Sequence, residues 1–191
     1  AHPKVAVDFL YDDERDAGPY PFDQNTPKEK GSDEHALMID EDNCILYELY
    51  HSWKEGDSNG ELTCEVPGAT DGWCGLSGAV YDLASNALRP DSWTSADAAG
   101  LPILPGLVRY DEVETGEIRH ALRFTVDISR TSWVWPARHE SGSTSNVNAP
   151  PMGLRLRMKA AYDLPAATPR VRTILAALKK YGMMVADNGT D

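Results

Sequence analysis

The side chains best suited to binding or catalysis lie between Asn86 and Val113. The same segment also contains many proline and glycine residues, which set the course of the backbone. Charged and amide groups stand at Asn86, Arg89, Asp91, Asp97, Arg109, Asp111 and Glu112, among Pro90, Gly100, Pro102, Pro105 and Gly106. A solvated loop does not need so many prolines and glycines to direct its course, and a core strand would not carry so many charges. We therefore predict a long, ordered loop that crosses one face of a domain and holds polar groups in place, as binding and catalytic sites require.

The carboxylates of this segment could perform acid–base chemistry on a glycosidic bond. Glycoside hydrolysis needs two carboxyl groups about 5–5.5 Å apart for retention of configuration, or about 6.5–9.5 Å apart for inversion. Asp97 and Asp111 are the preferred catalytic pair, because the adjacent Asp111 and Glu112 would point to opposite faces of a strand. In the competing interpretation, Asp97 caps its own helical turn and Asp111 forms an ion pair with Arg109.

Three histidines from separate segments offer further chemistry. His139 stands just before a loop rich in Ser, Asn and Gly and is the reserve catalytic acid or base. His120 lies on the apolar side of an alternating segment, where it would either contact substrate or be a satisfied core histidine. His35 could join them, but no metal-ligand spacing links the histidines, so neither a metal site nor a cofactor is predicted.

Aromatic residues could supply a platform for a sugar ring, whose apolar face packs on flat rings. Trp93 is the best candidate because it lies in the ordered segment. Polar residues would orient the sugar: Asn86, Arg89 and Arg109. Trp133 and Trp135 share one face of a short extended segment, so at least one of them is expected in the core. In the competing interpretation the tryptophans are mostly core residues.

The composition is that of an ordinary globular protein. The chain has 191 residues, 41% of them hydrophobic, which favours a single β-rich domain over residues 1–191. A net charge of −12 without a basic stripe disfavours nucleic acid and anionic membranes as partners, and no apolar run approaches the about 18 residues of a membrane span. No GxSxG elbow, HExxH pair or phosphate-binding loop is present. The first residue is Ala and no signal peptide is seen, which favours a processed chain, as in a secreted protein.

The three cysteines predict one disulfide and one free thiol. Cys64 and Cys74 lie in a Gly- and Pro-containing stretch that resembles a hairpin loop, and a bridge between them would contribute about 2–3 kcal/mol. Cys44 begins the apolar run Cys44-Ile45-Leu46-Tyr47 and is predicted to be a buried free thiol. The spacings of a structural zinc site are missing.

Hydrophobic alternation predicts many short strands and one convincing helix. Strand signals cover Val5 to Phe9, Glu34 to Ile39, Cys44 to Tyr50, Ser77 to Leu83, Val108 to Tyr110, Ile118 to Val126, Trp133 to Trp135, Leu154 to Met158 and Met183 to Ala186. A single helical turn is expected over Ala96 to Ala99. An amphipathic helix is predicted to begin after Thr168 as N-cap and to stop at Gly182. The fold class predicted is mainly β, an antiparallel β-sandwich or barrel with one amphipathic helix near the C-terminus.

Several long segments resemble a known family. They include DEHALMIDEDNCILYELY, SNALRPDSWTSADAAGLPILPGLVRYDEV, IRHALRF, VWPARH, PPMGLRLRMKA and LKKYGMMVADNG. The chain is similar, from about Lys4 to Asp191, to a poorly characterised family of secreted bacterial and fungal proteins associated with carbohydrate-binding and polysaccharide-degrading modules. The resemblance implies an extracellular, carbohydrate-associated role and no particular mechanism. The loop that holds Cys64 and Cys74 is longer here than in that family.

These observations favour a secreted protein that acts on a polysaccharide or oligosaccharide, as a glycoside hydrolase or a lyase. Asp97 and Asp111 would share the acid–base work. Two alternatives stay open: a non-catalytic carbohydrate-binding module that uses the same segment, and a structural or adhesive extracellular domain.

Overall fold

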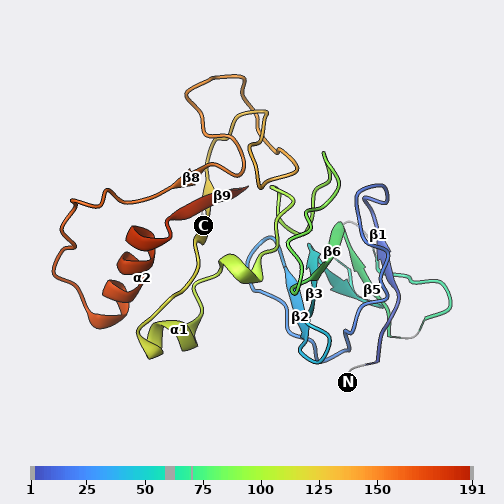
Figure 1. Cartoon of the computed structure of the whole chain (residues 1–191). Coiled ribbons are helices and arrows are strands. Elements are labelled where there is room, and N and C mark those ends of the chain that lie inside the picture. Colours follow the sequence, from blue (N-terminus) through green and yellow to red (C-terminus); the bar gives the residue numbers. More distant parts are fainter. Residues whose placement is uncertain (1–2, 59–62, 70, 190–191) are drawn as a thin grey trace.

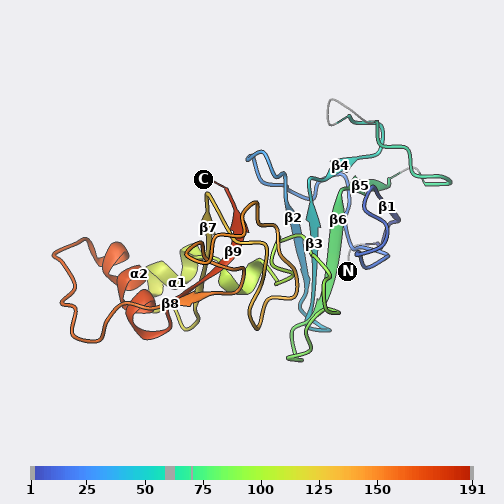
Figure 2. The same ribbon diagram turned by 90° about the horizontal axis from the view of Figure 1, so that it is seen from above.

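The structure is a computed structural model that describes residues 3–58, 63–69 and 71–189. Two halves lie side by side in both views, the amino-terminal one with two small sheets and the carboxy-terminal one with a third sheet and both α-helices (Figures 1 and 2). The described elements are β1 (Val7–Phe9), β2 (Ala36–Asp40), β3 (Ile45–Tyr50), β4 (Trp53–Lys54), β5 (Trp73–Gly75), β6 (Ser77–Asp82), η1 (Leu104–Gly106), α1 (Tyr110–Thr115), β7 (Leu122–Val126), β8 (Arg155–Leu156), α2 (Pro169–Lys180) and β9 (Met183–Asn188).

The chain is mainly β, as predicted, but its sheets are small and separate. The described residues form three three-stranded sheets, in the orders β1-β5-β4, β2-β3-β6 and β7-β9-β8. They do not close into a barrel, and they do not confirm a sandwich. Two sheets are mixed rather than antiparallel, because β1 runs parallel to β5 and β7 runs parallel to β9. A parallel pair requires a crossover connection, and the chain between β7 and β9 supplies it through α2.

The sheet β2-β3-β6 has two different faces. The predicted hairpin is confirmed, since β2 and β3 pair antiparallel along the whole of β2. One face packs on an aromatic core that contains Phe9, Tyr20, Phe22, Tyr47, Leu49 and Trp73. Side chains alternate along a strand, so Leu46 and Glu48 point to the opposite face, and both are fully buried. A second layer must therefore cover that face.

The covering layer is the segment from Leu83 to Arg109, which contains no strand and only the short 3₁₀ turn η1. The predicted long ordered loop from Asn86 to Val113 is therefore confirmed as far as Arg109, and its last residues belong to α1. Glu48 attaches this covering segment to the sheet, because its carboxylate accepts hydrogen bonds from the backbone N–H groups of Ile103 at 2.9 Å and Leu104 at 3.0 Å. The central strand and the polar segment are thus joined through one buried carboxylate.

The helical turn predicted over Ala96–Ala99 is not formed. The chain makes a tight turn there, in which the Gly100 N–H donates to the Asp97 carbonyl. The reason is local competition by side chains: the Asp97 N–H donates to Ser95 Oγ, and the Ala99 N–H donates to Asp97 Oδ1. Short polar side chains that bond nearby backbone groups in this way replace helical hydrogen bonds.

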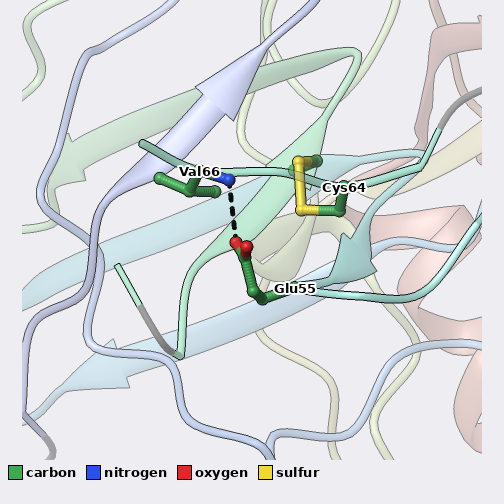
Figure 3. The surroundings of a disulfide bond; sticks show 4 residues. Glu55, Cys64 and Val66 are labelled. Atoms are coloured by element: carbon green, nitrogen blue, oxygen red, sulfur yellow. Dashed lines mark hydrogen bonds between the residues drawn. A yellow bond between two sulfur atoms is a disulfide. The ribbon is translucent and has the colours of Figure 1, made fainter. Parts of the chain in front are cut away.

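The predicted disulfide between Cys64 and Cys74 is confirmed (Figure 3). It joins the loop after β4 to β5, and both cysteines pack in a small cluster with Trp53 and Val66. Beside the bridge, the Val66 N–H donates to the Glu55 carboxylate at 2.8 Å. The bridge therefore ties the loop to β5 beside these apolar contacts.

The prediction for Cys44 is wrong, because its thiol is exposed. The backbone at Cys44 has φ 56°, in the left-handed region, at the end of the turn between β2 and β3. A short turn needs such a residue to reverse the chain. The strand consequently begins one residue later than predicted, at Ile45.

Removal of the disulfide, by Cys64→Ser with Cys74→Ser, is expected to lower the free energy of unfolding by about 2.5–3 kcal/mol, because the unfolded chain regains the freedom of the closed loop. Urea unfolding under non-reducing conditions measures the change. Cys44→Ser is the matched control and should shift stability by less than about 0.5 kcal/mol. Equal stability of the double variant and the wild type would show that the bridge constrains nothing.

In the carboxy-terminal half, the predicted helix is confirmed as α2. The side chain of Thr168 accepts a hydrogen bond from the Val171 N–H, and Gly182, with φ 82°, turns the chain into β9. The helix contributes Ala177 to a buried cluster with Ile118 and Leu122. Capping signals and the apolar face therefore predicted its limits well.

The helix α1 begins at Tyr110, the last residue of the strand predicted over Val108 to Tyr110. Asp111 and Glu112 lie in its first turn, where carboxylates favour the positive end of the helix dipole, and Gly116 ends it with φ 86°. Asp111 and Glu112 are therefore neighbours on a helix end, not residues on opposite faces of a strand. The next strand, β7, begins only at Leu122, so His120 precedes it.

Candidate functional site

An acidic pocket of about 260 Å³ lies where the covering segment meets strands of both halves. The strand β3 contributes Tyr50 and β9 contributes Asp187 and Asn188. The polar residues that line this acidic pocket are Asp33, Tyr50, Thr94, Ser95, Asp97, His139, Ser141, Asp187 and Asn188. The structure thus brings together Asp97 and His139, two of the three residues predicted as catalytic.

Two carboxylates at this pocket share one guanidinium group. Nη2 of Arg123, on β7, lies 2.7 Å from Asp97 Oδ2 and 3.6 Å from Asp187 Oδ2. The two carboxylate oxygens are therefore separated by no more than the sum of these distances, about 6.3 Å. The Asp97 side chain is 0% exposed and that of Asp187 is 18% exposed, so Asp187 is the carboxyl group that a bound molecule can reach.

Burial raises the pKa of both carboxyl groups. For Asp97 the loss of hydration outweighs the Arg123 charge and raises the pKa to about 7. Burial also raises the pKa of Asp187, against the opposing effects of the Asn188 amide and Arg123. A carboxyl group whose pKa is raised keeps its proton closer to neutral pH and can donate it in a reaction. Such a pair beside a pocket is a candidate acid–base site.

Glu48 adds a third buried carboxyl group to the same region. It is fully buried, and burial raises its pKa to about 7 although the amides of Ile103 and Leu104 oppose the shift. The charges of Asp97 and Arg123 also act on it, in opposite directions. Glu48 does not line the acidic pocket, so its role is to hold the covering segment in place.

Stability should consequently depend on pH through Glu48. Its pKa is about 7 in the folded chain against an ordinary 4.5, so the folded state binds this proton more tightly than the unfolded state. The resulting stabilisation is complete below about pH 4.5 and is lost as the pH rises to about 7, a change of about 3 kcal/mol. Glu48→Gln should remove this share of the pH dependence, as measured by urea unfolding between pH 4.5 and 7.5.

The control for this experiment is Glu41→Gln, at an exposed turn position. It should leave the dependence of the unfolding free energy on pH as in the wild type. An unaltered pH dependence in Glu48→Gln would show that burial of this carboxylate costs little.

One ring nitrogen of His139 makes a hydrogen bond to the backbone, and the other makes none with the described residues. Its Nδ1 donates to the Ala98 carbonyl at 2.9 Å, and its side chain is 29% exposed. Its Nε2 lies 3.9 Å from Glu14 Oε2, beyond hydrogen-bond distance. With the proton on Nδ1, Nε2 is free to accept a proton. The ring is therefore oriented by the covering segment, of which Ala98 is part.

Three other predicted residues lie elsewhere, around α1. Arg109 bonds Glu112 at 2.7 Å, and His120 Nε2 lies 3.1 Å from the second oxygen of Glu112. Asp111 is exposed in the first turn of α1. The acidic pocket contains none of Arg109, Asp111 and His120, so the structure does not unite Asp111 with Asp97. Arg109 takes Glu112 as its ion-pair partner, in place of the Asp111 expected in the competing interpretation.

The three remaining predicted residues lie on the first part of the covering segment. Arg89 is buried, and its guanidinium bonds the Asp16 carboxylate and two backbone carbonyls. Trp93 is half-buried, with the Arg89 guanidinium 5.4 Å from its ring centre. The Arg89 side chain is therefore occupied in joining this segment to the amino-terminal half, and Trp93 lies against that guanidinium. Asn86 is exposed and lines a larger groove.

Sequence reasoning missed the residues that organise the acidic pocket: Glu48, Arg123 and Asp187. Glu48 and Arg123 alternate with apolar residues on their strands, which is also the pattern of an ordinary solvated strand face. A charged residue in the middle of the strongly apolar β3 was the one available signal. Asp187 continues β9 beyond the predicted strand end at Ala186.

Comparison of the chain with models of protein families, with curated proteins and with solved structures gave no match. Among the described residues, His, Cys, Asp and Glu side chains form no group of three or more that could hold a metal ion. None of the helices in the described part of the chain has the length and apolar character needed to cross a membrane.

Proposed function

We propose that this protein hydrolyses a glycosidic bond at the acidic pocket by acid–base catalysis. The observation that carries the proposal is the pair formed by Asp97 and Asp187, both with raised pKa, at a single nitrogen of Arg123. The pocket beside this pair also presents His139. Titratable groups held in different environments are the usual source of an acid and a base in one site.

Asp187 is the general acid. It is partly exposed, and its raised pKa keeps the proton available for the leaving-group oxygen of the glycosidic bond. Asp97 has no exposed side-chain surface, so it acts as a positioning residue. Its ion pair with Arg123 fixes the position of that guanidinium, whose charge acts on the pKa of Asp187. The upper limit of about 6.3 Å between the two carboxylate oxygens is compatible with the about 5–5.5 Å of retaining enzymes, but the burial of Asp97 leaves no access for it as a nucleophile.

His139 is the general base. Its Nε2 accepts one proton from a water molecule whose oxygen bonds to the anomeric carbon, while the glycosidic C–O bond breaks. Asp187 gives its proton to the departing oxygen, so one proton is taken up and one is released by the protein. A single displacement of this kind inverts the anomeric configuration.

The charge of the pocket favours a neutral glycan as substrate. Asp33, Asp97 and Asp187 all line it, and Arg123 is already engaged by two of them. The described lining contains no Lys or Arg, so a uronate or a phosphate would find no free cationic partner there, which weighs against polysaccharide lyase chemistry. The resemblance to carbohydrate-associated secreted proteins supports a glycan, and the disulfide is compatible with an extracellular protein.

The test is a screen of the purified protein against neutral polysaccharides (β-glucan, xylan, mannan and starch) and anionic ones (alginate and polygalacturonate), with and without EDTA. The expected result is release of reducing ends from a neutral glycan, without unsaturated products and without an effect of EDTA. Unsaturated products from an anionic glycan would replace hydrolysis by lyase chemistry. Binding without any product would favour a non-catalytic carbohydrate-binding domain, and neither binding nor product would favour a structural domain.

A further inference from the structure

A second concave surface is lined by the two end parts of the covering segment, whereas its middle part, residues 94–98, lines the acidic pocket. This groove has a volume of about 600 Å³, against about 260 Å³ for the acidic pocket. Its walls come from the end of β6 and the chain after it, from the Pro-containing run that starts at Gly100, and from Trp135 and Pro136. The groove and the acidic pocket have no lining residue in common.

Trp135 is the most unusual residue of this groove, because it is a tryptophan that is 78% exposed. Its near neighbour Trp133 is partly buried and packs against the cluster around Met152, so one of the two tryptophans contacts the core, in agreement with the prediction. The backbone around Trp135 is held in place, because the Val134 N–H donates to the Met152 carbonyl and the Ala137 N–H to the Val134 carbonyl. An exposed indole on an ordered segment is a surface prepared for contact with a flat apolar partner.

Polar groups with unused hydrogen-bonding capacity accompany this ring. Asn86 is exposed, and its side-chain amide makes no hydrogen bond within the described residues. Asp82 uses Oδ1 to accept from the Ala84 N–H, and its second oxygen bonds nothing in the described part of the chain. Ser85 Oγ accepts from the Ala87 N–H and keeps its own proton to donate. The groove thus combines an aromatic face with donors and acceptors suited to hydroxyl groups.

The charges of the groove select against an anionic ligand. Arg89 lines it, but its guanidinium is buried and bonded to the Asp16 carboxylate and to the carbonyls of Glu14 and Thr94. Asp82 is the exposed charge that remains among the described lining residues. A ligand for this surface must therefore have an apolar face, many hydroxyl groups and no negative charge.

We propose that the groove is a binding site for a neutral saccharide chain, in which one sugar ring stacks on Trp135 and its hydroxyl groups bond Asn86 and Asp82. The choice of a glycan as ligand rests on the proposed function, whereas the binding surface itself does not depend on hydrolysis. The groove would hold a polysaccharide near the acidic pocket without taking part in bond cleavage. This role was assigned to Trp93 by the sequence, and Trp135 is the indole that the structure exposes.

The experiment is affinity electrophoresis in gels that contain β-glucan, xylan, mannan or starch, followed by fluorescence titration with the corresponding hexasaccharide. The Asp187→Asn protein is used, so that hydrolysis does not consume the ligand. We expect retardation by one neutral glycan, and a dissociation constant raised at least about tenfold by Trp135→Ala. Tyr162→Ala, which removes an exposed aromatic ring outside the groove, is the matched control and should bind as its parent does.

Three results would overturn the groove proposal: no retardation by any neutral glycan, equal binding by Trp135→Ala and its parent, or binding of a proline-rich peptide in place of the glycans. Circular dichroism of Trp135→Ala establishes that a loss of binding is not a loss of fold. Binding that depends on Trp135, in a protein that releases no product, would support the groove and contradict the proposed hydrolysis. If the wild type releases product but Trp135→Ala binds the glycan as well as its parent, the proposed hydrolysis is supported and the groove proposal is contradicted.

Discussion

Asp187→Asn is expected to lower kcat on the natural glycan by about 10³-fold, because an amide cannot donate the proton that the leaving oxygen needs. The raised pKa of Asp187 reflects its burial beside Arg123, and the isosteric amide keeps the volume of the side chain. The melting temperature should change little, since asparagine can still accept the hydrogen bond from the Asn188 N–H. Reducing-end assays and thermal unfolding on the same preparation measure both quantities.

Two further variants serve as a control and as a test of the alternative catalytic pair. Asp163→Asn removes an exposed carboxylate outside the acidic pocket and should retain full turnover. Asp111→Asn tests the pair predicted from the sequence, Asp97 with Asp111, against the pair found in the structure, Asp97 with Asp187. Asp111 lies on α1, away from the acidic pocket. A large loss of turnover in Asp111→Asn with none in Asp187→Asn would move the catalytic centre away from the acidic pocket.

Arg123→Met should lower the free energy of unfolding at pH 7.5 by about 3–5 kcal/mol, because it leaves buried carboxylates without their cation. Arg123 bonds Asp97 at 2.7 Å, lies 3.6 Å from Asp187 and acts electrostatically on Glu48. Methionine preserves the apolar stem of the arginine, so the change reports mainly the lost charge. Urea unfolding at pH 7.5 and pH 5 tests this, and the loss should shrink at pH 5 as the carboxyl groups take up protons.

The matched control is Arg119→Met, which breaks an ion pair with Glu117 at a site where the arginine side chain is 78% exposed. An exposed pair of this kind contributes little to stability, because solvent screens it, so the unfolding free energy should change far less than in Arg123→Met. A loss of similar size in the two variants would mean that the buried cluster of Asp97, Asp187 and Glu48 does not depend on Arg123 for its stability.

Local patterns in the sequence predicted the elements whose structure is decided locally. The hairpin of β2 and β3 follows from period-2 alternation, and α2 follows from Thr168, Gly182 and a continuous apolar face. The disulfide followed from two cysteines in one loop. The short helix α1 was missed because the residues before it, Val108 to Tyr110, favour a strand. That signal was given more weight than the acidic first turn and Gly116, which favour a helix.

The pairing of strands and the composition of the acidic pocket could not be predicted in the same way. Alternation shows which face of a strand is buried but not the direction of its neighbour, so the parallel pair of β7 and β9 left no trace in the pattern. Glu48 meets the amide of Ile103 55 positions later, and Asp97 meets Arg123 26 positions later. Such contacts depend on how the covering segment crosses the sheet, which is a property of the whole fold.

The most direct test of the account compares how Asp187→Asn acts on two substrates of the same sugar. One substrate is the natural glycan, whose departing oxygen needs a proton, and the other is a 2,4-dinitrophenyl glycoside, whose leaving group needs none. If Asp187 is the general acid, the variant loses about 10³-fold on the glycan and keeps most of the wild-type rate on the aryl glycoside. Equal losses on both substrates, or no loss on either, would contradict the assignment of the acidic pocket as the catalytic site.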